Sequence, residues 1–292
     1  MNEEVLNFGL DKKDYDIYKS FLNSPYKSYK HASYFQVYSD ILEPYRGKDI
    51  TFVEVGVLNG GSLFMWRDYF GPKARIIGLD FNPDALRWNE EGFEIHIGNQ
   101  ADPGFWDDLY SRIGEVDIVL DDGGHTNEQQ IVTLNKSIPN VRDGGLVIVE
   151  DTHTSYMNNF GNPSKYSFVN YAKFIVDSIN SRFPNLKLPQ NQFKDCVYNV
   201  SFYESIICFR IDRAKCFANF PVWNEGVTFN AEDFWDKDKT PGAIDRARDF
   251  VKAKASIVEN NPALREPLKK AYRKIFKVKS GMEFRKLKKY FK

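Results

Sequence analysis

A regular alternation of short apolar runs with helical segments between residues 49 and 150 constrains this chain more than any other feature. The runs cover residues 50–56, 75–81, 93–98, 116–121 and 146–150. They are rich in Val and Ile and mostly end in Gly or an acid, as strands buried in a parallel sheet do. The stretches between them, such as 60–69 and 126–138, have the spacing of helices. The pattern predicts an α/β fold with a doubly wound, mostly parallel sheet that binds ligands at the carboxyl ends of its strands.

The flanking segments add to this sheet. A helical pattern over residues 166–183 precedes residues 197–211, which predict two strands with a tight turn near Tyr203 and Glu204, and so an antiparallel hairpin that closes a seven-stranded sheet. The first 46 residues have Tyr, Phe and Leu at helical spacing. We therefore divide the chain into an N-terminal helical cap (1–46), a core (47–216), a helical or irregular extension (217–262) and a basic tail (263–292).

The charge of the chain is unevenly distributed. Forty basic residues balance forty acidic ones, yet residues 265–292 hold twelve basic and only two acidic residues. Apolar residues recur there at helical spacing, at Leu268, Tyr272, Ile275 and Phe276, and again at Phe284, Leu287 and Phe291 after Gly281. Such basic amphipathic helices bind anionic membrane surfaces. The alternative is that this stripe packs on the acidic body or on a second copy of the chain. Nucleic acid is not an expected partner, because the body lacks a basic patch.

Several features bear on the cellular setting. The chain has no run of about 18 apolar residues that could span a membrane, and it starts with acidic and polar residues rather than a secretory signal. Its three cysteines lack a CxxC spacing, which indicates reduced thiols and no zinc site. We therefore expect a cytoplasmic protein, peripheral at the inner face of the membrane if the tail binds lipid.

A glycine-rich turn follows the first predicted strand, in the sequence from Glu54 to Ser62. Glycines allow a backbone to approach a ligand closely, and the GxxxGG spacing differs from the dinucleotide fingerprint GxGxxG. Asp80 ends the second strand, where an acid can accept hydrogen bonds from both hydroxyls of a ribose. Because an acid at the end of the first strand suits an ammonium group, Glu54 and Asp80 together indicate a nucleoside that carries an amino acid, namely S-adenosylmethionine.

Acids also follow the fourth and fifth predicted strands, at Asp121, Asp122, Glu150 and Asp151. These strands are neighbours in a doubly wound sheet, so the four carboxylates converge and need a positive charge between them. Oxygen ligands without Cys favour a hard cation, Mg²⁺ or Ca²⁺, whereas zinc would require more His. His125, three residues after Asp122, is suited to act as a general base near pH 7.

The remaining histidines are less constrained by the sequence. His153 and, nearby, Tyr156 are candidate substrate contacts, although a solvated loop explains them equally well. His31 precedes a helical stretch that could cover the cofactor. His96 lies inside the third predicted strand and is expected to be structural.

The turn from Glu54 to Ser62, the DDGGH loop and the Glu150-Asp151-Thr152 strand end together resemble class I methyltransferases with a Rossmann-like fold. Within them, the similarity is to the metal-dependent sugar O-methyltransferases of macrolide biosynthesis, of the mycinamicin and macrocin type, and to cephalosporin-hydroxylase-like proteins. It covers about residues 28–211. The family often has DDGSH where this chain has Gly124. The resemblance implies His125 as the base and Asp122, Glu150 and Asp151 as metal ligands. The cofactor contacts that we assign are Glu54, Gly56, Asn59, Gly60, Ser62, Asp80, Gln100, Asp102 and Asp121.

The resulting hypothesis is an O-methyltransferase that uses S-adenosylmethionine and Mg²⁺ to methylate one hydroxyl of a saccharide, in a surface polysaccharide or a glycosylated natural product. A metal that binds two adjacent hydroxyls would serve a catechol equally well, so phenolic acceptors are the nearest alternative. A third alternative is a hydroxylase-like protein, or one that binds a nucleotide-linked ligand, with the same sheet.

Overall fold

The computed structural model describes residues 16–160 and 165–227, and beyond these only short pieces from residue 246 onward. The chain forms two compact units, Met1–Val222 and Trp223–Lys292. Every predicted site residue belongs to the first unit. The apolar stripe predicted in the tail, from Leu268 to Leu287, lies outside the described residues. In the part of the chain that is described, no helix is both long enough and apolar enough to cross a membrane.

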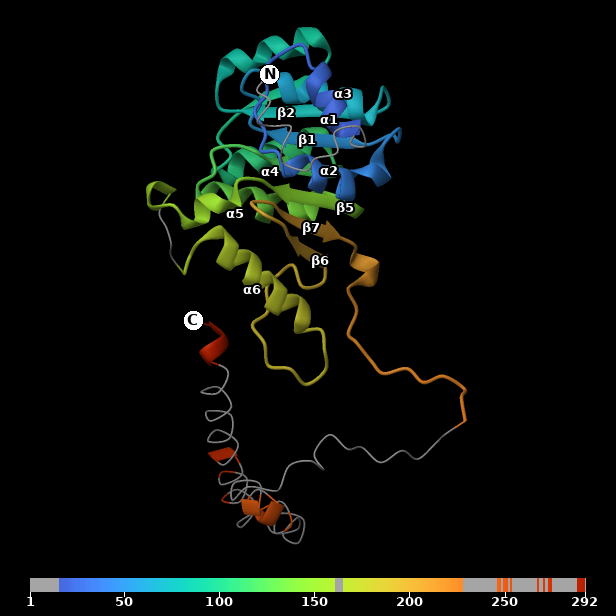
Figure 1. Ribbon diagram of the computed structural model, residues 1–292, viewed down its shortest axis with the longest axis vertical. Helices are drawn as coiled ribbons and strands as arrows, with labels where there is room; N and C mark the ends of the chain where they lie inside the picture. The colour runs from blue at the N-terminus through green and yellow to red at the C-terminus, as the bar shows by residue number, and fades with distance from the viewer. Residues whose placement is uncertain are drawn as a thin grey trace. The chain divides into compact units, whose positions relative to one another are not determined.

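The first unit is built on one seven-stranded sheet with the strand order β3-β2-β1-β4-β5-β7-β6 (Figure 1). The first five strands are parallel, and β7 runs antiparallel to both β5 and β6. This confirms the predicted doubly wound sheet with its closing hairpin. The strands are β1 Thr51–Val55, β2 Arg75–Asp80, β3 Glu94–Ile97, β4 Val116–Asp121, β5 Val141–Val149, β6 Val197–Phe202 and β7 Ile207–Ile211.

Strand β5 begins earlier than the apolar pattern predicts, at Val141 rather than at residue 146. Its first part is exposed and polar at residues 142–144, so it carries no apolar signal. The pairing with β4 shifts register here, and Gly144 has a φ of +87°. A Cβ on Gly145 would lie 2.4 Å from the carbonyl oxygen of Asp117. The two glycines therefore allow β5 to lie close against β4 across the irregularity.

Successive residues of each strand point to opposite faces of the sheet. Because residues on both faces are apolar, a layer of helices covers each face. Phe52, Ile118 and Ile148 pack in one core with α1 Asp16–Asn23, α2 Tyr34–Leu42 and α3 Gly61–Phe70. Val53, Val119 and Val149 pack in the other with α4 Pro103–Ile113, α5 Asn127–Ser137 and α6 Phe168–Asn180. The turns that follow β1, β2, β4 and β5 all lie at the carboxyl edge of the sheet, where ligands bind in folds of this kind.

Candidate active site

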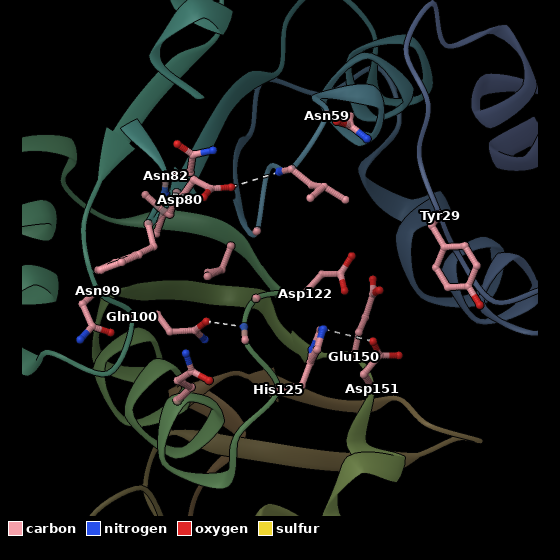
Figure 2. A pocket seen from close by; sticks show the side chains of 18 of the residues that line it. Tyr29, Asn59, Asp80, Asn82, Asn99, Gln100, Asp122, His125, Glu150 and Asp151 are labelled. Carbon is pink, nitrogen blue, oxygen red and sulfur yellow. Dashed lines mark hydrogen bonds and ion pairs between the residues drawn. The ribbon is translucent and has the colours of Figure 1, made fainter. Parts of the chain in front are cut away.

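A cavity of about 590 Å³ opens at the carboxyl edge of the sheet. Its walls come from the turns after β1 to β5 and from the segment of residues 29–34 before α2. Figure 2 shows Asp80, Asn82, Asn99 and Gln100 on one side of the cavity, and Asp122, His125, Glu150 and Asp151 on the other. Asp80 and Gln100, two of the predicted cofactor contacts, therefore face the same space as Asp122, His125, Glu150 and Asp151.

Asp80 anchors the first of these two sides. One carboxylate oxygen accepts hydrogen bonds from the backbone N–H groups of Val57 and Leu58, at 2.8 and 3.0 Å, and the other accepts from that of Asn82 at 2.8 Å. The carboxylate thereby joins the β1 turn to the end of β2 while still lining the cavity. Phe81 lies beside it with 76% of its surface exposed. An acid next to an exposed aromatic ring fits a nucleoside, which has both hydroxyls and a planar base.

Gly56 is required where the turns after β1 and β4 touch. Its φ is +91°, and a Cβ there would lie 2.1 Å from the carbonyl oxygen of Asp122. Gly56 and Asn59 line the cavity. Gly60 does not line it: a Cβ at this residue would lie 2.4 Å from the ring of Trp88, so the glycine serves packing.

Gln100 connects the end of β3 to the β4 turn. Its side-chain oxygen accepts from the N–H of Gly124 at 2.8 Å, and its NH₂ group donates to Asp121 at 3.0 Å. Asp121 is buried outside the cavity, and burial raises the pKa of its carboxyl against the hydrogen bonds from Gly123 and Gln100. Asp102 caps α4 by accepting from the N–H of Gly104 and also lies outside the cavity. Only Gln100 of these three predicted cofactor contacts faces the ligand space.

Glu54 lies behind the cavity instead of lining it, which differs from the predicted contact with an ammonium group of the ligand. Its two carboxylate oxygens accept from Ser62 Oγ at 2.7 Å and Trp66 Nε1 at 2.9 Å. Burial raises the pKa of Glu54 to about 7, although the nearby ammonium of Lys30 lowers it. Glu54 and Ser62 therefore bond to each other and to groups of the chain itself, and Lys30 is the ammonium that Glu54 faces.

Lys30 is a site residue that the sequence reasoning missed. Its Nζ lies 2.6 Å from Asp122 Oδ2, 3.0 Å from Glu150 Oε2 and 4.0 Å from Glu54 Oε1, and its side chain is 1% exposed. Burial alone would lower the pKa of Lys30, but the three carboxylates raise it above its ordinary value. No local pattern marks this residue, because its partners are distant in the sequence. A buried positive charge from the chain itself thus sits among the acids that converge at this edge.

Glu150 lines the back of the cavity and is itself fully buried. One carboxylate oxygen accepts from the Tyr38 hydroxyl and the other from Lys30 Nζ. Burial raises the pKa of this carboxyl, and the negative charge of Asp122 adds to the effect against the lowering by Lys30. Of the three predicted metal ligands, Glu150 is therefore the one whose two oxygens both accept a hydrogen bond from a side chain.

Asp122, His125 and Asp151 form the open part of this cluster. One ligand atom from each lies within 4.8 Å of the others, and His125 Nε2 is 3.4 Å from Asp151 Oδ2. His125 and Asp151 both have left-handed backbones, with φ of +58° and +53°. This conformation is uncommon for non-glycine residues, although Asp and His adopt it more readily than most, and such residues often cluster at functional sites. The carboxylate oxygens of Asp122 and Asp151 are suitable donors for a hard divalent cation, and the His125 imidazole lies beside them, so the residues fit the predicted metal and its base.

The remaining predicted residues lie at the rim. His31 and His153 line a second cavity beside the first, and His31 lines both. Tyr156 is 63% exposed and lines neither. His96 lies in β3 with its ring 2.8 Å from Glu94, away from the cavity lining, in agreement with a structural role.

A seven-stranded sheet in this order, with an acid at the end of its second strand, is the fold of class I S-adenosylmethionine-dependent methyltransferases. Among solved structures, the chain is similar to the MycE methyltransferase from the mycinamycin biosynthetic pathway in complex with Mg, SAH and mycinamycin VI. The sequences are 26% identical with a TM-score of 0.61, and the match covers 72% of this chain and 55% of that one.

Curated relatives have related names. The chain is 35% identical over 147 residues to demethylmacrocin O-methyltransferase of Streptomyces fradiae, a match that covers 46% of this chain and 37% of the relative. It is 37% identical over 124 residues to mycinamicin VI 2''-O-methyltransferase of Micromonospora griseorubida, covering 40% and 31%. No protein-family model matches the chain. These relatives confirm the predicted resemblance to sugar O-methyltransferases, and the chain spans well under half the length of each.

Proposed function

We propose that this chain is an O-methyltransferase that uses S-adenosylmethionine and a divalent cation, with Mg²⁺ as the expected ion, to methylate a sugar hydroxyl. The observation that carries the proposal is that one cavity of about 590 Å³ is lined by Asp80 and Phe81 as well as by Asp122, His125 and Asp151, with Asp80 on the side opposite the last three (Figure 2). A methyl donor and an acceptor hydroxyl can therefore meet in it. The names of the relatives, which are sugar O-methyltransferases, support a saccharide as the acceptor.

In this proposal the residues have separate tasks. Asp80 accepts hydrogen bonds from the ribose hydroxyls, and Phe81 offers a face to the adenine ring. Asp122 and Asp151 hold the cation, with Glu150 behind them. When bound, the cation supplies Lewis-acid polarisation of two adjacent hydroxyls of the acceptor.

His125 takes the proton at Nε2, the ring nitrogen that faces Asp151 at 3.4 Å. A bond forms between the acceptor oxygen and the methyl carbon while the bond from that carbon to sulfur breaks, and the electron pair stays on sulfur. Such an in-line displacement depends mainly on alignment of the reacting atoms. The hydrogen bonds of Gln100 with Gly124 and Asp121 maintain that alignment, because they fix the loop that carries His125.

Two binding and activity measurements test the proposal. Calorimetric titration with S-adenosylmethionine should detect binding to the unmodified chain and to His125→Ala, but binding to Asp80→Ala should be weakened at least tenfold. Methyl transfer should be abolished in His125→Ala, be retained in His96→Ala, and be lost in EDTA and restored by Mg²⁺. Absence of cofactor binding at millimolar concentration would exclude the methyltransferase function, and full activity in EDTA would remove the cation from the mechanism.

The acceptor class is tested with the same assay. Saccharides with a free vicinal diol should be methylated and simple catechols should not. Two further relatives favour the sugar, because their names, 8-demethyl-8-alpha-L-rhamnosyl tetracenomycin-C 2'-O-methyltransferase and L-olivosyl-oleandolide 3-O-methyltransferase, include a sugar. Comparative mass spectrometry of glycans from a deletion strain should then reveal which sugar has lost a methyl group. Transfer to catechols alone would support the phenolic alternative.

A peripheral location at an anionic membrane surface is our proposal for the tail, and it rests on the twelve basic and two acidic residues of 265–292. A membrane location would place the enzyme next to an acceptor that is assembled on a lipid carrier. The full chain should sediment with vesicles that contain anionic lipid and be released by salt, since salt screens exposed charges. Truncation after Asn261 should abolish sedimentation and leave activity on a soluble acceptor unchanged. Unfolding of the truncated protein would indicate instead that the tail packs on protein.

A further inference from the structure

Asp151 is surrounded by histidines to an unusual degree. The chain has four histidines, and three of them lie within ion-pair distance of this one carboxylate. His125 Nε2 is 3.4 Å from Oδ2, whereas His31 Nε2 and His153 Nδ1 are 3.7 and 3.8 Å from Oδ1. The two oxygens of Asp151 thus face two different sets of side chains. The first set contains Asp122 and His125, and the second contains His31 and His153.

We infer that His31, Asp151 and His153 form a second cation site, distinct from the one at Asp122 and His125, that takes a borderline transition ion such as Zn²⁺. One ligand atom from each of the three residues lies within 4.8 Å of the others. Ligands at about 2.1 Å from a tetrahedral ion lie about 3.4 Å apart. The contacts of Asp151 with the two imidazoles exceed that separation by only a few tenths of an ångström. Small side-chain rotations therefore suffice to complete the site.

Asp151 is held by the neighbouring Tyr34 hydroxyl, as metal ligands usually are held by polar groups. The Tyr34 hydroxyl is 2.5 Å from Asp151 Oδ1 and 2.8 Å from Ser205 Oγ, and Ser205 Oγ is 2.5 Å from His153 Nδ1. Ligation through Nδ1 would exchange this last contact for the ion. Ser205 has a φ of +62°, so it shares the left-handed backbone of Asp151 and His125.

The site is open to ions. His31 and His153 line a second cavity of about 480 Å³, together with Glu204 and Ser205. Their side chains are 43% and 38% exposed, so an ion can enter without any unfolding.

The two sites differ in their chemistry. Carboxylate oxygens alone suit a hard ion, while two imidazoles with one carboxylate suit Zn²⁺, Co²⁺ or Ni²⁺. The sequence alone argued against zinc for lack of His near the acid cluster, but the fold brings together histidines separated by more than one hundred residues. Since both sites share Asp151, two bound cations would repel each other. Zn²⁺ should therefore weaken Mg²⁺ binding and inhibit methyl transfer, a consequence that rests on the proposed function, whereas the binding itself does not.

Cobalt tests the site through its visible absorption, which intensifies in low-coordinate nitrogen and oxygen environments. The full chain is titrated with Co²⁺ without Mg²⁺ and without S-adenosylmethionine, and then with Zn²⁺ as a competitor. We expect one Co²⁺ per chain, displaced by Zn²⁺. His31→Ala and His153→Ala should each weaken Co²⁺ binding at least tenfold, with His31→Gln and His153→Gln as second variants if either alanine variant fails to fold.

His96→Ala is the matched control, since this histidine lies elsewhere in the first unit, and it should bind Co²⁺ as the unmodified chain does. His125→Ala should retain the Co²⁺ spectrum. Loss of the spectrum in His125→Ala but not in His31→Ala would place the ion at the first site and overturn the inference. Absence of stoichiometric binding, or equal weakening in His96→Ala, would do so too. Because no cofactor is present, these outcomes are independent of whether the chain transfers methyl groups.

Discussion

Replacement of Lys30 by methionine is the sharpest test of how the acid cluster is held together. The Lys30 ammonium is 2.6 Å from Asp122 and 3.0 Å from Glu150, with a side chain that is 1% exposed. Methionine fills similar space but removes the charge, so Glu54 and Glu150, both fully buried, lose their counter-ion. Removal of one partner of a buried ion pair costs about 3–5 kcal/mol. That is a large part of the ordinary 5–15 kcal/mol free energy of unfolding.

The assay is equilibrium urea denaturation at neutral pH in EDTA. With a slope of about 2 kcal/mol per molar urea, the midpoint of Lys30→Met should fall by about 2 M. Lys136→Met is the control, because its Nζ is 2.7 Å from Asp107 at the surface, where the pair is worth below about 1 kcal/mol. Adding Glu150→Gln to Lys30→Met should restore part of the loss, because it removes one uncompensated charge.

Mg²⁺ extends this test. In Lys30→Met a bound cation takes over the neutralising role of the ammonium, so Mg²⁺ should raise the urea midpoint of this variant more than that of the unmodified chain. The reasoning is refuted if Lys30→Met unfolds in EDTA within 1 kcal/mol of the unmodified chain. That result would mean that the buried carboxylates are protonated and need no counter-ion.

Two further substitutions probe the frame of the site. Gly56→Ala places a Cβ 2.1 Å from the carbonyl oxygen of Asp122, whereas Gly71→Ala, also at positive φ, meets nothing within 4 Å. Because of this overpacking, Gly56→Ala should lower the free energy of unfolding, measured by urea denaturation, by about 1–3 kcal/mol more than Gly71→Ala does. Equal losses in the two variants would contradict the contact. Thr126 forms a capping box with Gln129 at the start of α5, so Thr126→Ala should cost about 1 kcal/mol. A fall of about 2–4 °C in the melting temperature is expected, and an unchanged value would show that the cap adds nothing.

Much of the fold was predictable because its signals are local. Strands buried on both faces must be mostly apolar, which marks β1, β2 and β4 in the sequence. The turn near Tyr203 and the strands on either side of it similarly identify the β6–β7 hairpin. Since parallel strands end at one edge, the convergence of Asp80, Asp122 and Asp151 on a single cavity also follows from the order of the elements.

The tertiary structure alone decided which partner each polar group has. Glu54 was expected to meet a ligand, yet it accepts hydrogen bonds from Ser62 and Trp66 of the helix that follows. Lys30 has no local signal and reaches Glu150 from 120 residues away. His31 and His153, far apart in the sequence, likewise come together beside Asp151 only in the folded chain. Whether a segment is buried depends on the hydrophobicity of all its residues together, so the sequence pattern of the segment predicts it. Hydrogen bonds and ion pairs depend on distances of a few ångströms between single atoms, and only the packed chain sets those distances.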